Sequence, residues 1–276
     1  MMFLRYPGGL ARALTFSYDD GVEQDERLIR LLNEHGMKGT FNLNSGLFSS
    51  EGSVFAPGTV HRRMTLAHAR EVYMASGHEV AVHCFTHASL PELSQPQMVQ
   101  EIMMDRETLE GIFGGIVRGM AYPFGAFDDS VVEVLRMCGI LYARTVISSH
   151  GFALPRDWLR MAATCHHDDP MLMELADRFL SSKTCFESKL FYIWGHAYEF
   201  EANDNWQVIE SFLDKLAGRK DIWYATNIEI CSYTLAWKQV YTSVDGHLMH
   251  NPTDRAFWFE LDNKPMLIHP GETLAL

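Results

Sequence analysis

Residues 14–21 read LTFSYDDG, a mostly apolar run that stops at two adjacent carboxylates, Asp19 and Asp20, and a glycine. Residues 78–87 read HEVAVHCFTH, a second short apolar run that ends in His83 and His87. Short apolar runs of this kind are typical of buried strands. In parallel α/β barrels, catalytic groups lie at the ends of such strands. The two stretches therefore indicate both the fold and the position of a candidate site.

Short apolar runs alternate with helical patterns through most of the chain. The expected strands are 12–18, 39–43, 79–83, 117–123, 140–146, 190–195 and 222–226. The expected helices are 24–35, 65–76, 95–113, 128–138, 170–181, 206–217 and 228–239. Such alternation predicts a parallel sheet with right-handed crossovers. Because seven strands are too few for a regular eightfold barrel, we predict a distorted seven-stranded (β/α) barrel, with a doubly wound open sheet as the alternative.

The pattern changes after about residue 240, where short strand-like runs are separated by Asp-Gly, Asn-Pro and Pro-Gly turns. We therefore expect a barrel domain over residues 1–240 and a small β appendage over residues 241–276. A segment of this length is too small to fold alone. It is expected to pack on the barrel or to contribute to a homo-oligomer.

Composition excludes several classes of partner. The net charge of −12 argues against nucleic acid and anionic membranes as partners, and no apolar run reaches the roughly 18 residues of a membrane span. The five cysteines are scattered and include no C-x-x-C pair, so a disulfide framework is not expected. Residues 1–7 lack the pattern of a signal peptide. A cytoplasmic location is therefore the expectation, and a truncated secreted protein is the alternative.

The two opening segments can supply the ligands of a hydrolytic metal site. Two imidazoles and one carboxylate form the open three-ligand set of a catalytic zinc, and a neighbouring carboxylate can act as a base on bound water. Taken alone, the Asp-Asp pair is more often a turn or a helix cap, and a histidine pair four residues apart is more often incidental. Their matching positions after two predicted strands favour metal-assisted hydrolysis.

Two further strand ends carry candidate groups. Residues 121–125 read AYPFG, a tight loop whose backbone N–H groups could face the site. Residues 193–200 read IWGHAYEF and present His196, which could protonate a leaving amine or alkoxide. The competing interpretation of His196 is an imidazole with an ordinary place in the core.

Together, in order and spacing, these four segments resemble the motifs of the polysaccharide deacetylase family, carbohydrate esterase family 4, whose fold is a distorted seven-fold β/α barrel. The resemblance covers residues 14–200, and it implies a role for each matching residue. It implies that Asp19 is the general base and that the metal ligands are Asp20, His83 and His87. It implies further that the Phe124 N–H holds the oxyanion and that His196 is the general acid. The implied substrate-binding residues are Tyr122, Pro123 and Trp158.

The chain departs from the family pattern at two positions. Ala121 stands where many members carry an arginine that orients the base, and Arg144 or Arg160 could make that contact with Asp19 instead. Cys84 replaces the serine or threonine that usually follows the first histidine ligand.

Other residues near the motifs have less specific interpretations. Asp157 lies in a span where the family often carries an aspartate close to the site, and Glu199 could orient the ring of His196. Residues 166–169, His-His-Asp-Asp, are expected to form a surface loop and a helix cap.

The expected activity is removal of an acetyl group from an N-acetylated saccharide, or less favourably from an O-acetylated one, with zinc as the expected metal. One alternative is hydrolysis of another non-peptide C–N bond in a small molecule, because a fold does not fix a substrate. Two further alternatives are a carbohydrate-binding relative without catalytic activity and a metal site with a purely structural role.

Overall fold

The computed structural model describes residues 2–276. All seven expected strands are present, as β2 (Arg12–Asp19), β3 (Gly39–Leu43), β4 (Glu79–Val82), β5 (Gly119–Ala121), β6 (Tyr142–Ser148), β9 (Lys189–Gly195) and β10 (Ile222–Tyr224). The seven expected helices follow as α1 (Asp25–Glu34), α2 (Leu66–Met74), α3 (Gln95–Phe113), α4 (Asp129–Met137), α5 (Leu172–Ser181), α7 (Trp206–Leu216) and α8 (Asn227–Trp237). An eighth short helix, α6 (Ala197–Ala202), lies directly after the predicted His196 motif and was not expected.

The barrel closes through a strand that the sequence did not reveal. β7 (Met161–Ala163) pairs in parallel with β6, and β8 (Cys165–His166) pairs in parallel with β9. Thr164 lies between them, and its backbone N–H donates to the carbonyl of Tyr192 at 2.7 Å. The segment 161–166 therefore leaves β6 and joins β9, so the ring runs β2-β3-β4-β5-β6-β7/β8-β9. This is a distorted seven-stranded barrel, as predicted.

The expected strand at 222–226 has a different place from the one that a seven-membered ring would give it. β10 pairs only with the first part of β2, from Arg12 to Leu14, while β3 pairs with β2 from Phe16 onward. It therefore lies outside the ring, beside the part of β2 that β3 does not cover. The seventh position of the barrel belongs to residues 161–166 instead.

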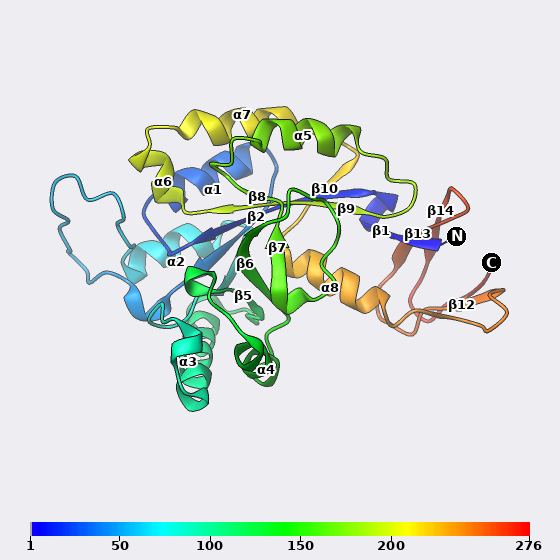
Figure 1. The fold of residues 1–276 in the computed structure, drawn as a ribbon, viewed down its shortest axis with the longest axis horizontal. Coiled ribbons are helices and arrows are strands. Elements are labelled where there is room, and N and C mark those ends of the chain that lie inside the picture. Colours follow the sequence, from blue (N-terminus) through cyan, green and yellow to red (C-terminus); the bar gives the residue numbers. More distant parts are fainter. Residues whose placement is uncertain (1) are drawn as a thin grey trace.

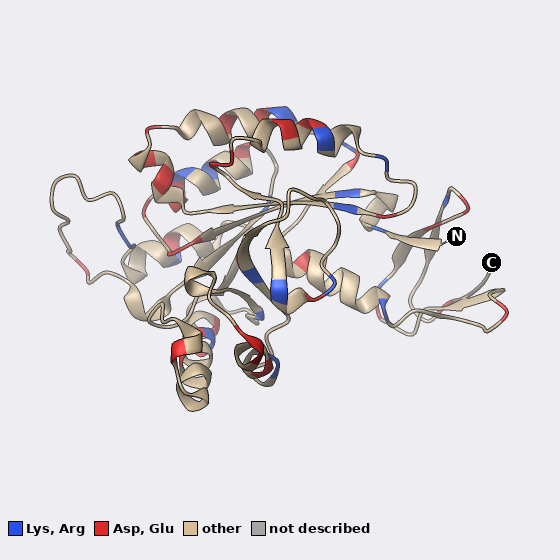
Figure 2. Ribbon diagram, in the orientation of Figure 1, with Lys and Arg blue, Asp and Glu red and all other residues tan. Residues whose placement is uncertain are grey.

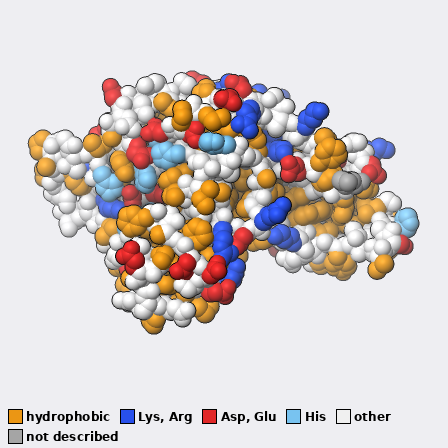
Figure 3. Space-filling model, in the orientation of Figure 1, with side chains coloured by type: hydrophobic (Ala, Val, Ile, Leu, Met, Phe, Trp, Pro, Cys, Tyr) orange, Lys and Arg blue, Asp and Glu red, His pale blue; other side chains and the backbone are white. Residues whose placement is uncertain are grey.

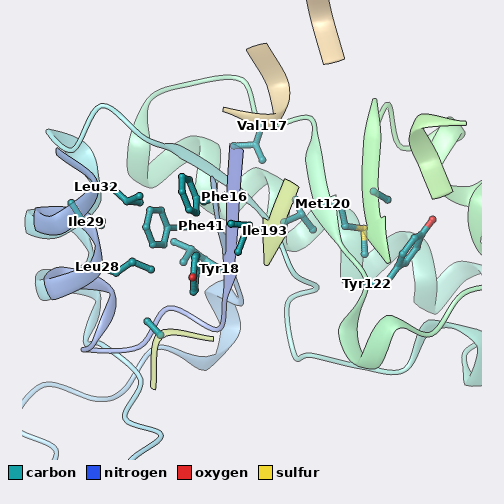
Figure 4. Packing of buried hydrophobic residues seen from close by; sticks show 14 of the residues in the cluster. Phe16, Tyr18, Leu28, Ile29, Leu32, Phe41, Val117, Met120, Tyr122 and Ile193 are labelled. Carbon is teal, nitrogen blue, oxygen red and sulfur yellow. The ribbon is translucent and has the colours of Figure 1, made fainter. Parts of the chain in front are cut away.

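The alternation of side chains along β2 explains how the core and the site are separated. Leu14, Phe16 and Tyr18 are fully buried and belong to the large apolar cluster between the barrel and its helices. Figure 4 shows Phe16 and Phe41 packed against the apolar side of α1. Because side chains alternate along a strand, Ser17 and Asp19 point to the opposite side, into the barrel. The strand thus ends with a carboxylate on its inner face.

The appendage also includes the start of the chain. β1 (Met2–Arg5) pairs with β13 (Phe257–Leu261), which pairs with β14 (Lys264–Ile268). A second small sheet is built from β11 (Tyr241–Thr242), β12 (Leu248–His250) and β15 (Thr273–Ala275). Both sheets lie at one end of the molecule, near both termini (Figure 1). The domain boundary at residue 240 remains a proposal, since β1 of the first segment completes a sheet of the second.

The surface carries charges of both signs. Figure 2 shows acidic and basic residues mixed along α5 and α7, with no uniformly basic face in that view. Among residues 2–276, no helix combines the length and the apolar character that a membrane crossing requires. Figure 3 shows several histidine side chains close together on the face that it displays.

Candidate metal centre and active site

Left-handed backbone turns place the metal-ligand candidates beside one another. Asp20 has φ +86° and Gly21 has φ +66°, so the chain bends sharply as soon as β2 ends. After β4, Cys84 and His87 have φ +64° and φ +57°. The second turn brings the ring of His87 back to that of His83, with 4.8 Å between their centroids. The structure therefore brings together the residues of the two opening motifs.

The donor atoms of Asp20, His83 and His87 fit a divalent cation. One ligand atom of each lies within 4.8 Å of the others. His83 Nδ1 is 2.8 Å from the Ala121 carbonyl oxygen, so Nδ1 carries the proton and leaves Nε2 as a lone-pair donor. Burial lowers the pKa of His83, and it lowers that of His87 to about 4, so both rings are neutral donors near pH 7. This set matches the ligand chemistry of zinc.

Asp19 is buried next to this set and is held by polar groups on both oxygens. The Arg144 guanidinium hydrogen-bonds to Oδ2, and the Asn42 amide donates to Oδ1 at 2.8 Å. Oδ2 also lies 3.8 Å from His83 Nε2 and 3.9 Å from His196 Nε2. Burial alone would raise the pKa of Asp19, but the Arg144 guanidinium holds it below its ordinary value. The carboxylate is therefore ionised and placed between a ligand candidate and His196.

His196 stands at the start of α6, where the helix fixes its partner. Its Nδ1 lies 3.2 Å from Glu199 Oε1, and its backbone N–H donates to Glu199 Oε2 at 3.2 Å. Burial would lower the pKa of His196, but the hydrogen bond with Glu199 and the nearby Asp19 charge raise it above its ordinary value. The imidazole is thus suited to carry a proton that it can give away.

Sequence reasoning missed two basic residues that contact Asp20. His61 Nε2 is 3.1 Å from Oδ2, and Arg63 Nη2 is 2.9 Å from Oδ1. Arg63 also donates to the side chain of Asn44 at 2.7 Å. Burial would raise the pKa of Asp20, and the His61 hydrogen bond and the Arg63 charge hold it far below its ordinary range. Both residues lie at the end of the long loop between β3 and α2 (Figure 1). This loop has no strand or helix periodicity, so no pattern in the sequence could have identified them.

A third missed residue fixes the backbone of the site. Asp105 on α3 is fully buried and accepts from the Ser45 N–H at 2.7 Å, the Ser45 hydroxyl at 2.6 Å and the His83 N–H at 3.0 Å. Burial raises the pKa of Asp105 to about 7. One carboxylate therefore joins the segments after β3 and β4. In the sequence it is simply a polar position in a helix, and no local pattern marks it.

In the loop after β5, the side chain that is exposed to solvent is not one of those predicted to contact the substrate. Tyr122 and Pro123 are buried, and the Tyr122 hydroxyl donates to the Leu159 carbonyl at 2.7 Å. The turn at Phe124, with φ +58°, leaves that ring 69% exposed, and its centroid is 4.5 Å from that of His87. The substrate contacts of Tyr122 and Pro123 stay predictions, and the exposed aromatic surface of this loop belongs to Phe124.

Two residues of the segment before β7 that were predicted to lie near the site also have surroundings different from those predicted. Trp158 is 4% exposed and lies in the second apolar cluster, so it offers almost no surface to a substrate. Asp157 is hydrogen-bonded to Arg160, and Arg160 also reaches Asp129. Arg160 is thus engaged away from Asp19, and the contact that it might have made is made by Arg144.

The prediction that residues 166–169 form a surface loop and a helix cap is wrong in part. Asp169 does cap the turn into α5, where its Oδ1 accepts from the Met171 N–H at 2.9 Å. His166 instead belongs to β8, and His167 is completely buried. His166 and His167 are therefore part of the barrel rather than of a surface loop, because the closing strand was not recognised.

Comparisons with known proteins agree with this fold. The family model described as polysaccharide deacetylase matches residues 7–143, about half of the chain. No curated protein matches the chain.

Solved structures share the fold at low sequence identity. A Mycobacterium smegmatis protein assigned to the polysaccharide deacetylases is 16% identical, with a TM-score of 0.60 over 85% of this chain and 94% of that one. The Xyl-CE4 domain of a multidomain xylanase, from the hindgut metagenome of Trinervitermes trinervoides, is 16% identical, with a TM-score of 0.54 over 82% and 92%. A family 4 carbohydrate esterase from Streptomyces lividans, solved with acetate, is 16% identical, with a TM-score of 0.51 over 78% and 93%.

The family model and the barrel lead to the same assignment. The model covers β2 to β5, which carry the aspartate pair, the histidine pair and the Phe124 loop. The chain belongs to the polysaccharide deacetylase family, enzymes that hydrolyse the amide bonds of acetylated sugars.

Proposed function

We propose that this protein is a zinc-dependent deacetylase that removes the acetyl group from the nitrogen of an N-acetylated saccharide. One observation carries the proposal: Asp19 Oδ2 lies 3.8 Å from the ligand candidate His83 and 3.9 Å from His196. A base, a ligand set and a proton donor are thus within reach of one substrate group. The reaction needs those three functions together.

The cation would be held by Asp20, His83 and His87. When bound, it supplies Lewis acidity that polarises a carbonyl oxygen and brings the pKa of water toward about 7. His61 contacts Oδ2 of Asp20 and Arg63 donates to Oδ1, so both oxygens of the carboxylate are held in place. Such supporting contacts orient a ligand before the cation arrives.

The remaining steps belong to the chain's own residues. Asp19 takes the proton of the attacking water, and Arg144 and Asn42 keep its carboxylate ionised and oriented. The Phe124 backbone N–H is proposed to donate to the oxygen that becomes negative as the carbonyl is attacked. A donor of this kind contributes on the order of 3 kcal/mol to transition-state stabilisation. His196 then gives its proton to the departing nitrogen, which leaves as the free amine of the sugar.

The surroundings favour a neutral, hydroxyl-rich substrate. The exposed Phe124 ring next to His87 offers a flat apolar face, and Tyr198 lies between His61 and His196, with centroid distances of 4.8 Å and 5.3 Å. Aromatic faces suit the apolar side of a sugar ring, and the net charge of −12 does not attract an anionic polymer. We also propose a cytoplasmic location, which favours a short soluble saccharide as the substrate.

Acetate release from a defined panel tests the proposal. Zinc-loaded protein is incubated with N-acetylated chito-oligosaccharides, O-acetylated xylo-oligosaccharides and small N-acetyl amides, and acetate is measured. We expect the N-acetylated saccharides to be cleaved fastest. Asp19→Asn, which keeps the shape of the side chain, is expected to lower kcat by at least about 100-fold. Fastest cleavage of the small amides would instead favour the alternative substrate class.

The idle carbohydrate-binding alternative has its own signature. It predicts saccharide binding without acetate release under the same conditions. That result, with zinc bound at one equivalent, would overturn the proposed activity.

A further inference from the structure

A line of buried polar side chains inside the barrel leads to Asp19. The Asn42 amide of β3 donates from Nδ2 to Asp19 Oδ1 and to Ser17 Oγ, both at 2.8 Å. Nδ2 also lies 3.3 Å from the Tyr18 carbonyl oxygen. Among residues 2–276, nothing hydrogen-bonds to Asn42 Oδ1, although this atom is buried. The orientation of the amide therefore depends on the partners of its NH2 group alone.

The line continues from Ser17 to Tyr192 of β9 and to Asn227, the first residue of α8. The Tyr192 hydroxyl accepts from Asn227 Nδ2 at 2.8 Å. Burial raises the pKa of Tyr192 above its ordinary value, and hydrogen bonds with Ser17 and Asn227 offset part of this effect. All three side chains are buried. The Tyr192 hydroxyl therefore joins the residue beside Asn42 to the start of α8.

Asn227 is fixed at the far end of this line. Its Oδ1 accepts from the Thr15 hydroxyl at 2.9 Å, and its backbone N–H donates to the Thr40 hydroxyl at 3.1 Å. The Thr40 hydroxyl in turn donates to Glu79 Oε2 at 2.8 Å. Thr15 precedes Asp19 by four residues of β2, roughly 13 Å along the strand. A helix that follows the barrel strands is thus hydrogen-bonded to β2, β3 and β4 well below the candidate base.

The directions of these hydrogen bonds favour one orientation of Asn42. The amide must turn its NH2 group to the ionised Asp19, because Oδ1 in that place would face another negative oxygen. Ser17 accepts the other NH2 hydrogen, and Tyr192 is then the partner for the hydrogen of Ser17 itself. A buried network in which every such member has its partner fixes a single geometry.

We propose that Tyr192 and Asn227 are positioning residues, which act through Ser17 and Asn42 to fix the carboxylate of Asp19. This inference rests on the proposed function, in which Asp19 takes a proton from water. Arg144 holds Oδ2 of Asp19, and Asn42 holds Oδ1. A catalytic group has to be held within roughly 0.5 Å of its productive position, and its neighbours have to be held as well.

Tyr192→Phe removes one hydroxyl and keeps the ring. The hydrogen of Ser17 is then free to turn toward Asn42, and the amide can rotate so that Oδ1 accepts it. Asp19 loses a donor in that rotation. We expect kcat to fall about tenfold while KM and zinc affinity stay within about threefold, because the lost hydrogen bonds involve no metal-ligand candidate. Asn227→Ala should act in the same direction.

A double-mutant cycle tests whether Tyr192 acts through Asn42. Asn42→Leu removes the amide at similar volume and should itself lower kcat about tenfold or more. In that background Tyr192→Phe should change kcat by less than about twofold, since the group that it orients is gone. Asn42→Ala is the second background if Asn42→Leu does not fold. A further tenfold fall in both backgrounds would show that Tyr192 does not act through the amide.

Tyr233→Phe is the matched control on the same helix, α8. The Tyr233 hydroxyl is also buried, accepts from the Trp258 N–H at 3.1 Å and donates to the Arg5 carbonyl at 2.9 Å. Its loss should lower Tm as Tyr192→Phe does, because each variant leaves a buried N–H without its partner. It should leave kcat unchanged. A tenfold fall of kcat in this control would mean that general loosening of α8 explains the effect.

Hydrogen exchange of the Asn42 side-chain amide, followed by NMR, gives a readout that does not involve acetate. Its signal is the one that Asn42→Leu lacks. Exchange should be at least about tenfold faster in Tyr192→Phe than in wild type and in Tyr233→Phe.

The outcomes separate this inference from the proposed activity. An unchanged kcat or an unchanged exchange rate in Tyr192→Phe overturns the positioning role. If the wild type releases no acetate, the deacetylase proposal fails, and the exchange rate alone decides whether Tyr192 holds Asn42. Faster exchange, lower kcat and no further effect in the Asn42 variants support both proposals.

Discussion

At the scale of single residues, the candidate base is the centre of the arrangement. Asp19 is almost completely buried, yet it remains ionised because Arg144 lies against Oδ2. Arg144 is itself 1% exposed and stacks its guanidinium on Trp194, 4.3 Å from the ring centroid. The family's usual arginine position is Ala121 here, and the guanidinium comes from the neighbouring strand β6, where Arg144 pairs in register with Ala121. A charge at the same place can thus be supplied from a different strand.

Arg144→Ala should reduce catalysis rather than substrate binding. Without the guanidinium, burial should raise the pKa of Asp19 and leave less of it ionised at neutral pH. We expect kcat to fall by about 100-fold or more with KM within about threefold of wild type. The low-pH limb of the rate profile should move to higher pH, because the base must lose its proton to act.

Arg160→Ala is the matched control for that experiment. Arg160 pairs with Asp157 and Asp129, so its loss should leave kcat unchanged. An unchanged kcat in Arg144→Ala, with the thermal melt showing folded protein, would dismiss the positioning role.

The site residues that the sequence predicts differ from those that it does not predict in what places them in the site. Asp19, Asp20, His83 and His87 follow strands, and strand ends are visible as apolar runs. His61 and Arg63 reach Asp20 across 41 and 43 residues of chain. Their contacts depend on the course of a loop, which no local periodicity encodes. Trp158 is buried in an apolar cluster built from residues far apart in the chain, and no local pattern in the sequence predicts that burial.

At the scale of elements, α3 supports the metal-ligand segment through Asp105. This residue binds the backbone of His83 without facing the ligand atoms. Asp105→Asn should therefore weaken the affinity for zinc by about 10–100-fold while the ligand set stays complete. Isothermal titration with zinc measures this change.

The control for Asp105 is Glu107→Gln, an exposed position on the same helix. Its zinc affinity should equal that of wild type. Equal affinities in all three proteins would show that α3 does not position the site.

The contact between α1 and α2 predicts a pH-dependent stability. Asp25 is fully buried at the start of α1, and the Tyr73 hydroxyl of α2 donates to its Oδ2 at 2.5 Å. Burial raises the pKa of Asp25 from 3.8 to about 8. The folded state therefore binds a proton that the unfolded state has lost between these values, so the free energy of unfolding falls as pH rises from about 4 through 8.

Asp25→Asn removes that proton uptake. Between pH 4 and pH 9, the free energy of unfolding of the wild type should fall, relative to that of the variant, by on the order of a few kcal/mol. Urea melts at several pH values measure the difference. Glu34→Gln, an exposed change on the same helix, should track the wild type. A constant difference between wild type and Asp25→Asn across this range would refute the assigned pKa direction.

The elements themselves were predictable where they are long and regular. Helices such as α3 and strands such as β2 and β9 carry clear periodicity, and the sequence bounds agree with them to within one or two residues. β7 and β8 are three and two residues long, and Thr164 between them makes the switch from β6 to β9. Such short pieces are stabilised by barrel closure rather than by local sequence, which is why the closing strand was missed.

At the scale of the whole molecule, the two ends of the chain complete one apolar cluster. β1 pairs with β13, and the Phe257 ring of β13 lies 5.1 Å from Tyr233 and 5.7 Å from Trp237 of α8. The appendage thus covers a helix that follows the last strand of the barrel sheet. We propose that it contributes stability rather than chemistry.

Phe257→Ala tests this assignment. Removing a fully buried phenylalanine costs about 3–5 kcal/mol, which corresponds to a fall in Tm on the order of 10 °C at this chain length. Acetate release per folded molecule at low temperature should not change. Tyr241→Ala, at a residue 58% exposed in the same appendage, should leave Tm within about 2 °C. A Phe257→Ala protein with wild-type Tm would show that the appendage does not stabilise the barrel.

The proposed active site depends on where the cation binds. Crystals of the protein loaded with one equivalent of zinc, with diffraction recorded at the zinc absorption edge, give the ion's position directly. The predicted result is one anomalous peak about 2.0–2.2 Å from an Asp20 oxygen and from Nε2 of His83 and His87, with Asp19 beside it. A peak at any other position, with none between these three residues, would contradict the assignment of the active site.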